Sequence, residues 1–433
     1  MLAILTTHPI QYQVPLWQAL ARDKRIPFEV WYLTDHGINP THDPQFRRSF
    51  AWDLDMLSGY PHRFLEVAPG AAPNSFWKCR LRESLAKRMH EANVKALWVQ
   101  GWQVAAYWQA VWAAKTIGVE VWLRGESNDI APTPFWKRAV KRVILGQLFH
   151  RVDRFLYIGT ANRRLYEKFG VSAGQLYPAP YAVDNERFAG QADAIRDQRA
   201  EIRSQWGIPE NAFCVLFCGK FIRKKRPLDL VKAAQLLLPA RRALQLGEIT
   251  NNSVTVNYLS DIHLLFVGSG ELGGELRAHC NVVFDAESPS TPGNKEPITD
   301  NRKPAASFAG FLNQTEISKA YVAADCLVLP SDYGETWGLV VNEAMASGLP
   351  CVISDQSGCA EDLGSFSPNE IFRCGDILAL EKRIASFSSV KPIGSPRVEF
   401  RHLYSLGNAI DTVIELYQAA ESSRAPLGHR GFL

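Results

Sequence analysis

The 433-residue sequence lacks the features that mark secreted or membrane-spanning proteins. No apolar run approaches the roughly 18 residues that cross a membrane. The apolar start Met1–Thr6 has no basic region or cleavage site, so it is predicted to be a first strand. The eight cysteines are scattered and form no CxxC pair, which is typical of buried thiols in a reducing compartment. We therefore expect a cytoplasmic protein without a disulfide framework.

The sequence also lacks an excess of charge of one sign. Its 48 basic and 44 acidic residues leave a formal charge of +4, which suits anionic ligands such as phosphates but not nucleic acid. Apolar residues make up 46% of the chain, which is enough for a large core. Because one hydrophobic core rarely exceeds roughly 250–300 residues, two domains are expected.

Short apolar runs alternate with helical patterns along the chain, which favours βαβ units on parallel sheets. In the first half, strands are predicted at Leu2–Thr6, Phe28–Tyr32, Ala96–Val99, Val119–Leu123 and Arg154–Ile158, with helices at Gln13–Arg22, Arg80–Ala92 and Gln103–Thr116. In the second half, strands are predicted at Cys214–Cys218, His263–Val267, Val282–Phe284, Cys326–Pro330 and Pro350–Ser354. The sequence therefore predicts an α/β protein with two doubly wound, Rossmann-like domains.

Polar stretches set the expected boundaries. The charged stretch Asp184–Gly207 is interpreted as a linker, which gives domains at residues 1–190 and 207–395. Residues 396–433 are expected to form a C-terminal helix that packs back on the first domain. Gly247–Ser260 and Ala286–Ser307 are polar segments, and the second is predicted to be a flexible surface insertion.

The strongest candidate site follows the strand Cys326–Pro330. A loop leads into a predicted helix, Gly338–Ser347, and ligands of parallel sheets bind beyond the carboxyl ends of strands. The amides of Gly338, Leu339 and Val340 would then point out of a helix N-terminus and suit a phosphate.

Two carboxylates, Glu335 and Glu343, flank this turn. They would repel a diphosphate, so we expect them to accept hydrogen bonds from the hydroxyls of a sugar and a ribose. The alternative is that Glu335 caps the helix and Glu343 is a solvated helix residue.

Two further loops follow strands of the second half. Gly219 permits a tight exit from its strand, and Lys220 and Lys225 would flank a diphosphate and neutralise the charge on a leaving group. The alternative is a solvated basic loop. Gly268 lies in a Gly-Ser-Gly turn that permits backbone approach to a nucleotide, although a simple tight turn explains it equally well.

In the first half, the loop after the first strand carries His8, Gln11 and Tyr12. These side chains are candidates for contact with an acceptor or the reaction centre; the alternative is that His8 caps a helix and Tyr12 packs. Arg124 and Glu126 follow another strand and are candidates for the same cleft.

The segment Pro134–His150 is amphipathic. Trp136, Val140, Ile144 and Leu148 form an apolar stripe beside a basic one. Such a helix can lie on anionic lipid, or it can simply pack with a solvated basic face.

The motifs of the second half resemble the retaining family 4 glycosyltransferases. The segments GKFIRKKRPLDL, VGSGEL, FAGFLNQTEISKAYVAADCLVLPS and ETWGLVVNEAMASGLPCV, followed by Gln356–Gly358, occur in the family's order over Cys214–Leu363. PYAVDNERF resembles the end of the family's N-terminal domain. The resemblance implies the GT-B fold, in which two Rossmann-like domains face each other across a cleft.

The resemblance also implies roles for individual residues. Glu343 would bind the donor ribose and Glu335 the transferred sugar. Lys220 and Lys225 would bind the diphosphate, with Lys220 replacing an arginine and losing its bidentate fork. Phe311 and Leu312 fall where the family meets the nucleotide base. We expect no metal and no cofactor.

The resemblance implies a UDP- or GDP-sugar donor and a saccharide or lipid-linked acceptor, in bacterial surface polysaccharide synthesis. The first half departs from the family, because it lacks the glycine-rich loop after its first strand and a histidine near Arg124. Two alternatives therefore stay open: a non-catalytic sugar-nucleotide binder or partner subunit, and a GT-B sugar-nucleotide epimerase.

Overall fold

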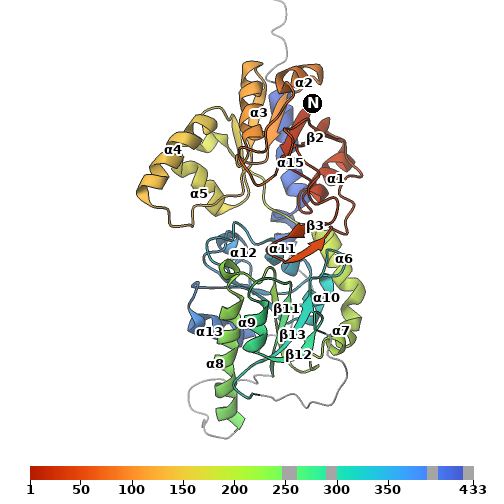
Figure 1. Ribbon diagram of the computed structural model, residues 1–433, viewed down its shortest axis with the longest axis vertical. Coiled ribbons are helices and arrows are strands. Elements are labelled where there is room, and N and C mark those ends of the chain that lie inside the picture. The colour runs from red at the N-terminus through yellow and green to blue at the C-terminus, as the bar shows by residue number, and fades with distance from the viewer. Residues whose placement is uncertain (246–260, 289–299, 388–397, 423–433) are drawn as a thin grey trace, which may run out of the picture. The chain divides into compact units, whose positions relative to one another are not determined.

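The computed structural model describes residues 1–245, 261–288, 300–387 and 398–422. The chain divides into two compact units. The first contains Met1–Thr41, Asp55–Ala182 and His402–Leu433, and the second contains His42–Leu54 and Val183–Arg401. Each unit is a parallel sheet with helices on both faces (Figure 1).

The first unit has a seven-stranded parallel sheet in the order β5-β2-β1-β6-β7-β8-β9. All five strands predicted for the first half are confirmed, because each is a short buried apolar run. The strands are β1 (Leu2–Thr6), β2 (Phe28–Tyr32), β5 (His62–Phe64), β6 (Ala96–Val99), β7 (Glu120–Leu123), β8 (Arg154–Tyr157) and β9 (Leu176–Pro178).

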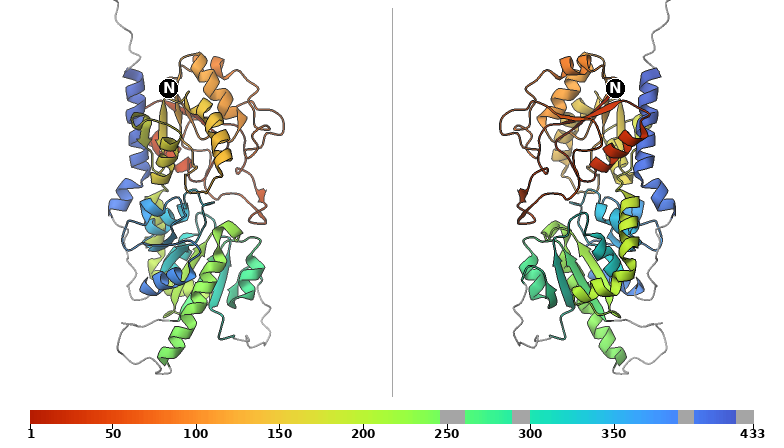
Figure 2. Two further views of the ribbon diagram at one scale, coloured as in Figure 1. Left: turned by 90° about the vertical axis from the view of Figure 1, so that its left-hand side faces the viewer. Right: turned by 90° about the vertical axis from the view of Figure 1, so that its right-hand side faces the viewer.

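Helices cover both faces of the first sheet. One face packs against α2 (Leu85–Glu91), α3 (Ala105–Thr116) and the last turn of α4 (Phe135–Phe149). On the other side, the C-terminal helix α15 (Leu406–Ser422) lies beside α1 (Val14–Asp23), as Figure 2 shows in blue and red. Arg25 Nη2 donates to Asp411 Oδ1 at 2.5 Å across these two segments.

The helix predicted at Arg80–Ala92 is too long at its start. The Arg80 carbonyl accepts from the Ala68 amide at 2.8 Å, in a non-helical arrangement. The Ser84 hydroxyl then caps α2 by accepting from the Lys87 amide. The capping serine rather than the apolar spacing therefore sets the helix start.

The second unit also has a seven-stranded parallel sheet, in the order β12-β13-β11-β10-β14-β15-β16. The strands predicted for the second half are confirmed. They are β10 (Phe213–Cys218), β11 (Ile262–Val267), β12 (Asn281–Asp285), β14 (Cys326–Leu329) and β15 (Cys351–Ser354), with the further strands β13 (Ala305–Gly310) and β16 (Glu370–Phe372).

The insertion predicted at Ala286–Ser307 is wrong at its end. Strand β13 begins at Ala305, and Ser307 is fully buried. Its hydroxyl donates to the Trp206 carbonyl at 2.6 Å, so it accepts from His263 Nε2 at 2.8 Å. Residues 289–299 and the polar segment Gly247–Ser260 lie outside the described residues.

The linker predicted at Asp184–Gly207 is wrong. This stretch forms two helices of the second unit, α6 (Asn185–Ile195) and α7 (Arg199–Gln205), joined by a short 3-10 turn. They contact α10 (Ser318–Ala323), while α8 (Pro227–Gln245) and α13 (Ile377–Phe387) pack together elsewhere on the sheet (Figure 1). The unit boundary at Val183 therefore precedes the predicted one.

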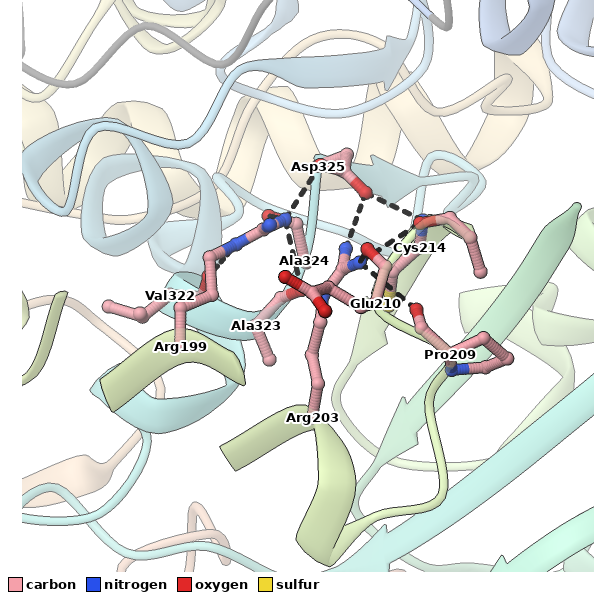
Figure 3. Close-up of polar contacts among 10 residues, drawn as sticks. Arg199, Arg203, Pro209, Glu210, Cys214, Val322, Ala323, Ala324 and Asp325 are labelled. Carbon is pink, nitrogen blue, oxygen red and sulfur yellow. Dashed lines mark hydrogen bonds and ion pairs between the residues drawn. The ribbon is translucent and has the colours of Figure 1, made fainter. Parts of the chain in front are cut away.

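Buried charge explains why this helical stretch was misread. Arg203 is 2% exposed and donates to Asp325 Oδ2 at 2.6 Å, while Arg199 donates to Asp325 Oδ1 at 2.7 Å (Figure 3). The Arg203 guanidinium also donates to the carbonyls of Pro209, Glu210, Ala212 and Ala323. Polar residues that look solvent-exposed in the sequence thus fix α7 to the start of β14.

No helix in the described parts of the chain is long and apolar enough to cross a membrane.

Candidate functional site

The candidate donor site lies where four neighbouring strands of the second unit end. In sheet order β13, β11, β10 and β14, these strands lead to Phe311, Gly268, Gly219 and Ser331. The strands are parallel, so their carboxyl ends meet at one edge, where ligands of such sheets bind. The structure therefore brings the predicted loops of the second half together.

Glycines let these strand ends approach closely. Gly219, Gly268 and Gly310 all have positive φ values, of 146°, 126° and 71°. A Cβ atom on Gly268 would lie 2.0 Å from the Gly219 carbonyl oxygen. The Gly268 amide donates to the Gly310 carbonyl at 2.7 Å. Close contact between strand exits thus accounts for Gly268 without a ligand.

Glu343 lies in α11 (Leu339–Ala346), is 3% exposed and is held by two polar side chains. The Tyr321 hydroxyl donates to Oε2, and Gln314 Nε2 donates to Oε1 at 3.5 Å. A solvated role for Glu343 is therefore wrong. Burying a carboxylate is costly unless it is hydrogen-bonded, so these partners fix its position beside the strand ends.

Glu335 and Lys225 form an ion pair. Lys225 Nζ donates to Glu335 Oε2, and Ser331 Oγ donates to the same oxygen at 3.3 Å. The Lys225 and Glu335 side chains are 19% and 13% exposed, so Lys225 does not belong to a solvated basic loop. Glu335 does not cap α11, whose N-cap is Gly338 without a side-chain bond. The pair places one cation and one carboxylate next to each other at the end of β14.

The start of α11 has the backbone form expected for an anion site. Gly338 has a φ of 111°, and a Cβ there would meet Leu329 Cδ2 at 2.7 Å. The first amides of a helix have no partner within it, which applies here to Leu339 and Val340. Gly338 therefore permits a turn that another residue would strain.

The sequence reasoning missed the segment His42–Leu54, here called the 42–54 segment. It belongs to the second unit and carries the last two residues of β3 (Thr41–Asp43) and all of β4 (Arg48–Phe50). Lys220 Nζ donates to Asp43 Oδ2 at 2.9 Å and to Gln45 Oε1 at 2.8 Å. The Phe311 ring has its centroid 4.6 Å from that of Phe50. The aromatic spacing of Phe46, Phe50 and Trp52 is the one signal in the sequence, and it does not reveal a partner.

The first unit contains a separate cavity of about 570 Å³ at the ends of β1 and β2. His8 lies in its wall, with its ring centroid 5.1 Å from that of His36. Burial and the neighbouring His36 lower the pKa of His8 to about 4. His8 therefore stays neutral near pH 7 and does not cap a helix, since α1 begins at Val14. The cavity lining is Thr7, His8, Ile10, Thr34, Asp35, His36, Asn39, Ala71, Ala72, Pro73, Asn74 and Gln103.

The other candidates of the first unit are not part of that lining. Gln11 and Tyr12 lie in the turn before α1. Arg124 is 4% exposed, with its guanidinium carbon 4.9 Å from the centroid of the Tyr181 ring. Burial lowers the pKa of Arg124, and among the described residues its Nε has no hydrogen-bond partner. Glu126 lies close enough to raise the pKa of Tyr181, after the larger effect of burial. Arg124 and Glu126 thus share one cluster around Tyr181.

Residues 298–397 match the family model of glycosyl transferases group 1. This range contains Phe311, Glu335 and Glu343 but not Lys220 or Lys225. A D-inositol 3-phosphate glycosyltransferase from Arthrobacter sp. (strain FB24) is 31% identical over 160 residues, or 37% of this chain and 30% of that protein. The matched part of the chain spans about a third of the length of such relatives.

Solved structures match nearly the whole chain at low identity. A glycosyltransferase from Rickettsia africae ESF-5 has a TM-score of 0.64 and 12% identity, covering 97% of this chain and 98% of that one. Anabaena Alr3699/HepE in complex with UDP and glucose has a TM-score of 0.59 and 14% identity, covering 96% and 99%. With two seven-stranded Rossmann-like sheets, the chain has the α/β GT-B fold.

Proposed function

We propose that the chain is a retaining, metal-independent hexosyltransferase that uses a nucleotide-diphosphate sugar. The observation that carries the proposal is the buried Glu343, held by Tyr321 and Gln314 at the strand ends where Lys225 and Glu335 also meet. Without a ligand, a fold gains little from burying this carboxylate at the strand ends. Two oriented carboxylates and two lysines match the hydroxyls and phosphates of a sugar nucleotide.

In this proposal each group has a separate role. Glu343 accepts hydrogen bonds from the ribose hydroxyls, and Glu335 accepts them from the transferred sugar. Charge builds on the diphosphate as the glycosidic bond breaks. It is stabilised by Lys220, by Lys225 and by the amides at the start of α11, those of Gly338, Leu339 and Val340. Phe311, Leu312, Gly219 and Gly268 border the nucleotide. No protein nucleophile is assigned.

The donor is proposed to be a UDP- or GDP-sugar, and nucleotide-dependent melting tests this. UDP, GDP, ADP and CMP are added to wild type, to Glu343→Ala and to Glu275→Ala, an exposed control on α9 (Gly273–Ala278). A ligand at about 100 times its dissociation constant adds roughly 2.7 kcal/mol of stability. We expect one nucleoside diphosphate to stabilise wild type and the control but not Glu343→Ala. Stabilisation of all three proteins alike would remove Glu343 from the donor site.

Turnover separates the enzyme from a non-catalytic binder. The protein is incubated with UDP-glucose or GDP-mannose and a mixture of saccharides, and release of nucleoside diphosphate is followed. A binder would be stabilised by the nucleotide and would release none. An epimerase would instead change the sugar while it stays on the nucleotide.

The acceptor is proposed to bind in the cavity of the first unit, with His8 at the reaction centre. Within the described residues the lining holds no lysine or arginine, only one carboxylate, Asp35, and otherwise hydroxyl, amide and imidazole groups beside apolar ones. This chemistry fits the hydroxyls of an uncharged saccharide, free or lipid-linked, better than a phosphorylated one. Gln11, Tyr12, Arg124 and Glu126 are proposed to contact the acceptor beyond this cavity. Neutral methyl glycosides should therefore act as acceptors while their 6-phosphates should not, and His8→Ala should lower kcat.

Contact with anionic lipid is proposed for α4. Its residues 135–144 are all exposed, including Phe135 at 82% and Val143 at 68%. The same turns carry Lys137, Arg138, Lys141 and Arg142. Vesicles rich in phosphatidylglycerol should bind wild type, and replacing these four cations by serine should abolish binding. Equal binding to phosphatidylcholine vesicles would contradict the charge argument. Taken together, these proposals fit a cytoplasmic enzyme of bacterial surface polysaccharide synthesis.

A further inference from the structure

The 42–54 segment contacts three of the four strand ends that form the candidate donor site. At β10 it pairs with Lys220. At β11, Ser269 Oγ donates to the Phe46 carbonyl at 2.7 Å. At β13, Asn313 Nδ2 donates to the Ala51 carbonyl at 2.9 Å. The first half of the chain thus supplies a cover for a site whose other residues all come from the second half (Figure 1).

Asp43 and Gln45 occupy the hydrogen-bonding positions on Lys220 that we expect a phosphate to take. Asp43 Oδ2 and Gln45 Oε1 take two of the three hydrogens of the ammonium group, at 2.9 and 2.8 Å. Asp43 Oδ1 meanwhile accepts from the amides of Gln45 and Phe46 at 2.8 and 3.0 Å. Burial raises the pKa of Asp43, but the hydrogen bond and charge of Lys220 together with the two amide hydrogen bonds outweigh burial and keep the pKa below its usual value. An ionised carboxylate therefore sits where Lys220 would meet a diphosphate.

The aromatic side chains of the segment surround Phe311. The rings of Phe46, Phe50 and Trp52 have centroids 5.2, 4.6 and 6.3 Å from that of Phe311. The Arg48 guanidinium carbon lies 5.0 Å from the same centroid. Asp53 anchors the far end, because its carboxylate accepts from the amides of Gln314 and Thr315 at 3.1 and 3.0 Å. The 42–54 segment thus contacts both Lys220 and the position proposed for the nucleotide base.

We infer that the 42–54 segment is an internal competitor of the donor nucleotide. Asp43 holds Lys220 in the donor-free protein, and a bound diphosphate takes its place and releases the segment from the strand ends. This inference rests on the proposed role of Lys220. The two anions cannot share the lysine at low cost, because the carboxylate and the diphosphate repel each other when both are partly removed from water.

The competition lowers the apparent affinity for nucleotide. When the competent state is only a fraction of the population, the measured dissociation constant equals the intrinsic one divided by that fraction. The Lys220 and Asp43 side chains are 26% and 27% exposed, so their pairing is partly screened. Removing the negative charge should therefore tighten nucleotide binding by about 2- to 5-fold, on the order of a partly exposed ion pair.

The test compares UDP and GDP binding to four full-length proteins by calorimetry. These are wild type, Asp43→Asn, Lys220→Ala and Asp300→Asn. Asp300→Asn is a charge-matched control, because Asp300 in the same unit pairs with the exposed Arg302 instead. We expect Asp43→Asn to bind the preferred nucleotide more tightly, Asp300→Asn to match wild type, and Lys220→Ala to bind about 10-fold or more weakly.

Hydrogen exchange of the 42–54 amides provides a second readout. Nucleotide should speed exchange in this segment of wild type, as expected for displacement. Slower exchange, or weaker binding by Asp43→Asn, would overturn the inference and make the segment a supporting wall. Unchanged binding by Asp43→Asn with weak binding by Lys220→Ala would also overturn it, while the proposed donor site would stand. If Lys220→Ala binds as well as wild type, the proposed role of Lys220 itself fails.

Discussion

Replacing Arg203 by methionine should destabilise the second unit strongly. The Arg203 side chain is 2% exposed, and each of its nitrogens donates a hydrogen bond in the structure (Figure 3). Methionine fills similar space, so the loss is chiefly polar. It leaves the carbonyls of Glu210, Ala212 and Ala323 without the guanidinium, and Asp325 with one cation fewer.

The expected loss of stability depends on the partners that Asp325 keeps when Arg203 is replaced. Removing one partner of a buried ion pair typically costs about 3–5 kcal/mol, since the other charge is left buried. Here Asp325 keeps Arg199 at 2.7 Å and the Cys214 amide at 2.7 Å, so the lower end, about 3 kcal/mol, applies. The matched control is Arg199→Met. Arg199 is 31% exposed, so its loss should cost about 1 kcal/mol.

Thermal unfolding monitored by circular dichroism measures the difference. In a unit of 150–250 residues, 1 kcal/mol shifts Tm by about 2–4 °C, so Arg203→Met should lower Tm by about 6–12 °C. Arg199→Met should lower it by about a third as much. The Tm of Arg203→Lys should be close to that of Arg203→Met, because one ammonium group cannot reach the several carbonyls and the carboxylate together. Equal shifts for Arg203→Met and Arg199→Met would refute the reasoning.

Three further outcomes are expected. Gly268→Ala should cost about 3–5 kcal/mol, visible as a lower Tm, because its Cβ would lie 2.0 Å from the Gly219 oxygen at a φ of 126°; an unchanged Tm would contradict the close approach. Tyr321→Phe removes a donor to Glu343 and should weaken nucleotide binding by about 10-fold without altering the fold by circular dichroism. His263 has a pKa lowered from 6.5 to about 4 by burial and then by Arg203, so the unfolded chain binds more protons between these values. Stability from this residue is complete above pH 6.5 and is lost, by roughly 3 kcal/mol, as the pH falls towards 4. The urea midpoint of His263→Asn should depend less on pH between 4 and 6.5 than that of wild type. An unchanged dependence would show that His263 is not its cause.

The sequence predicted the strands well because each buried strand is a short apolar run between breakers. It missed β13 because its sequence, AASFAG, is small and partly polar and follows a polar stretch. The burial of Ser307 depends on His263 and Trp206, which are distant in the chain. The misread linker has the same cause, since Arg203 is buried only because Asp325 and several carbonyls satisfy it.

The site residues of the second half were predictable as a group because each follows a strand in the same parallel sheet. The contacts between these side chains could not be predicted. Nothing local indicates that Lys225 meets Glu335, or that Tyr321 orients Glu343, since these contacts depend on which strands are neighbours. In the first half, the polar loop after β1 was correctly placed at a strand end, but its partner His36 follows β2 and was overlooked.

The 42–54 segment shows why a motif can locate a site and still misstate its chemistry. From the motif alone, Lys220 is a free cation that awaits a phosphate. In the structure it already holds Asp43 and Gln45, which lie 177 and 175 residues away in the chain. Its useful charge is therefore set by the balance between a tethered carboxylate and a diffusing diphosphate. Since the tethered group is present at a high effective concentration, the donor must gain its advantage from further contacts, at Glu343, at Lys225 and at the start of α11.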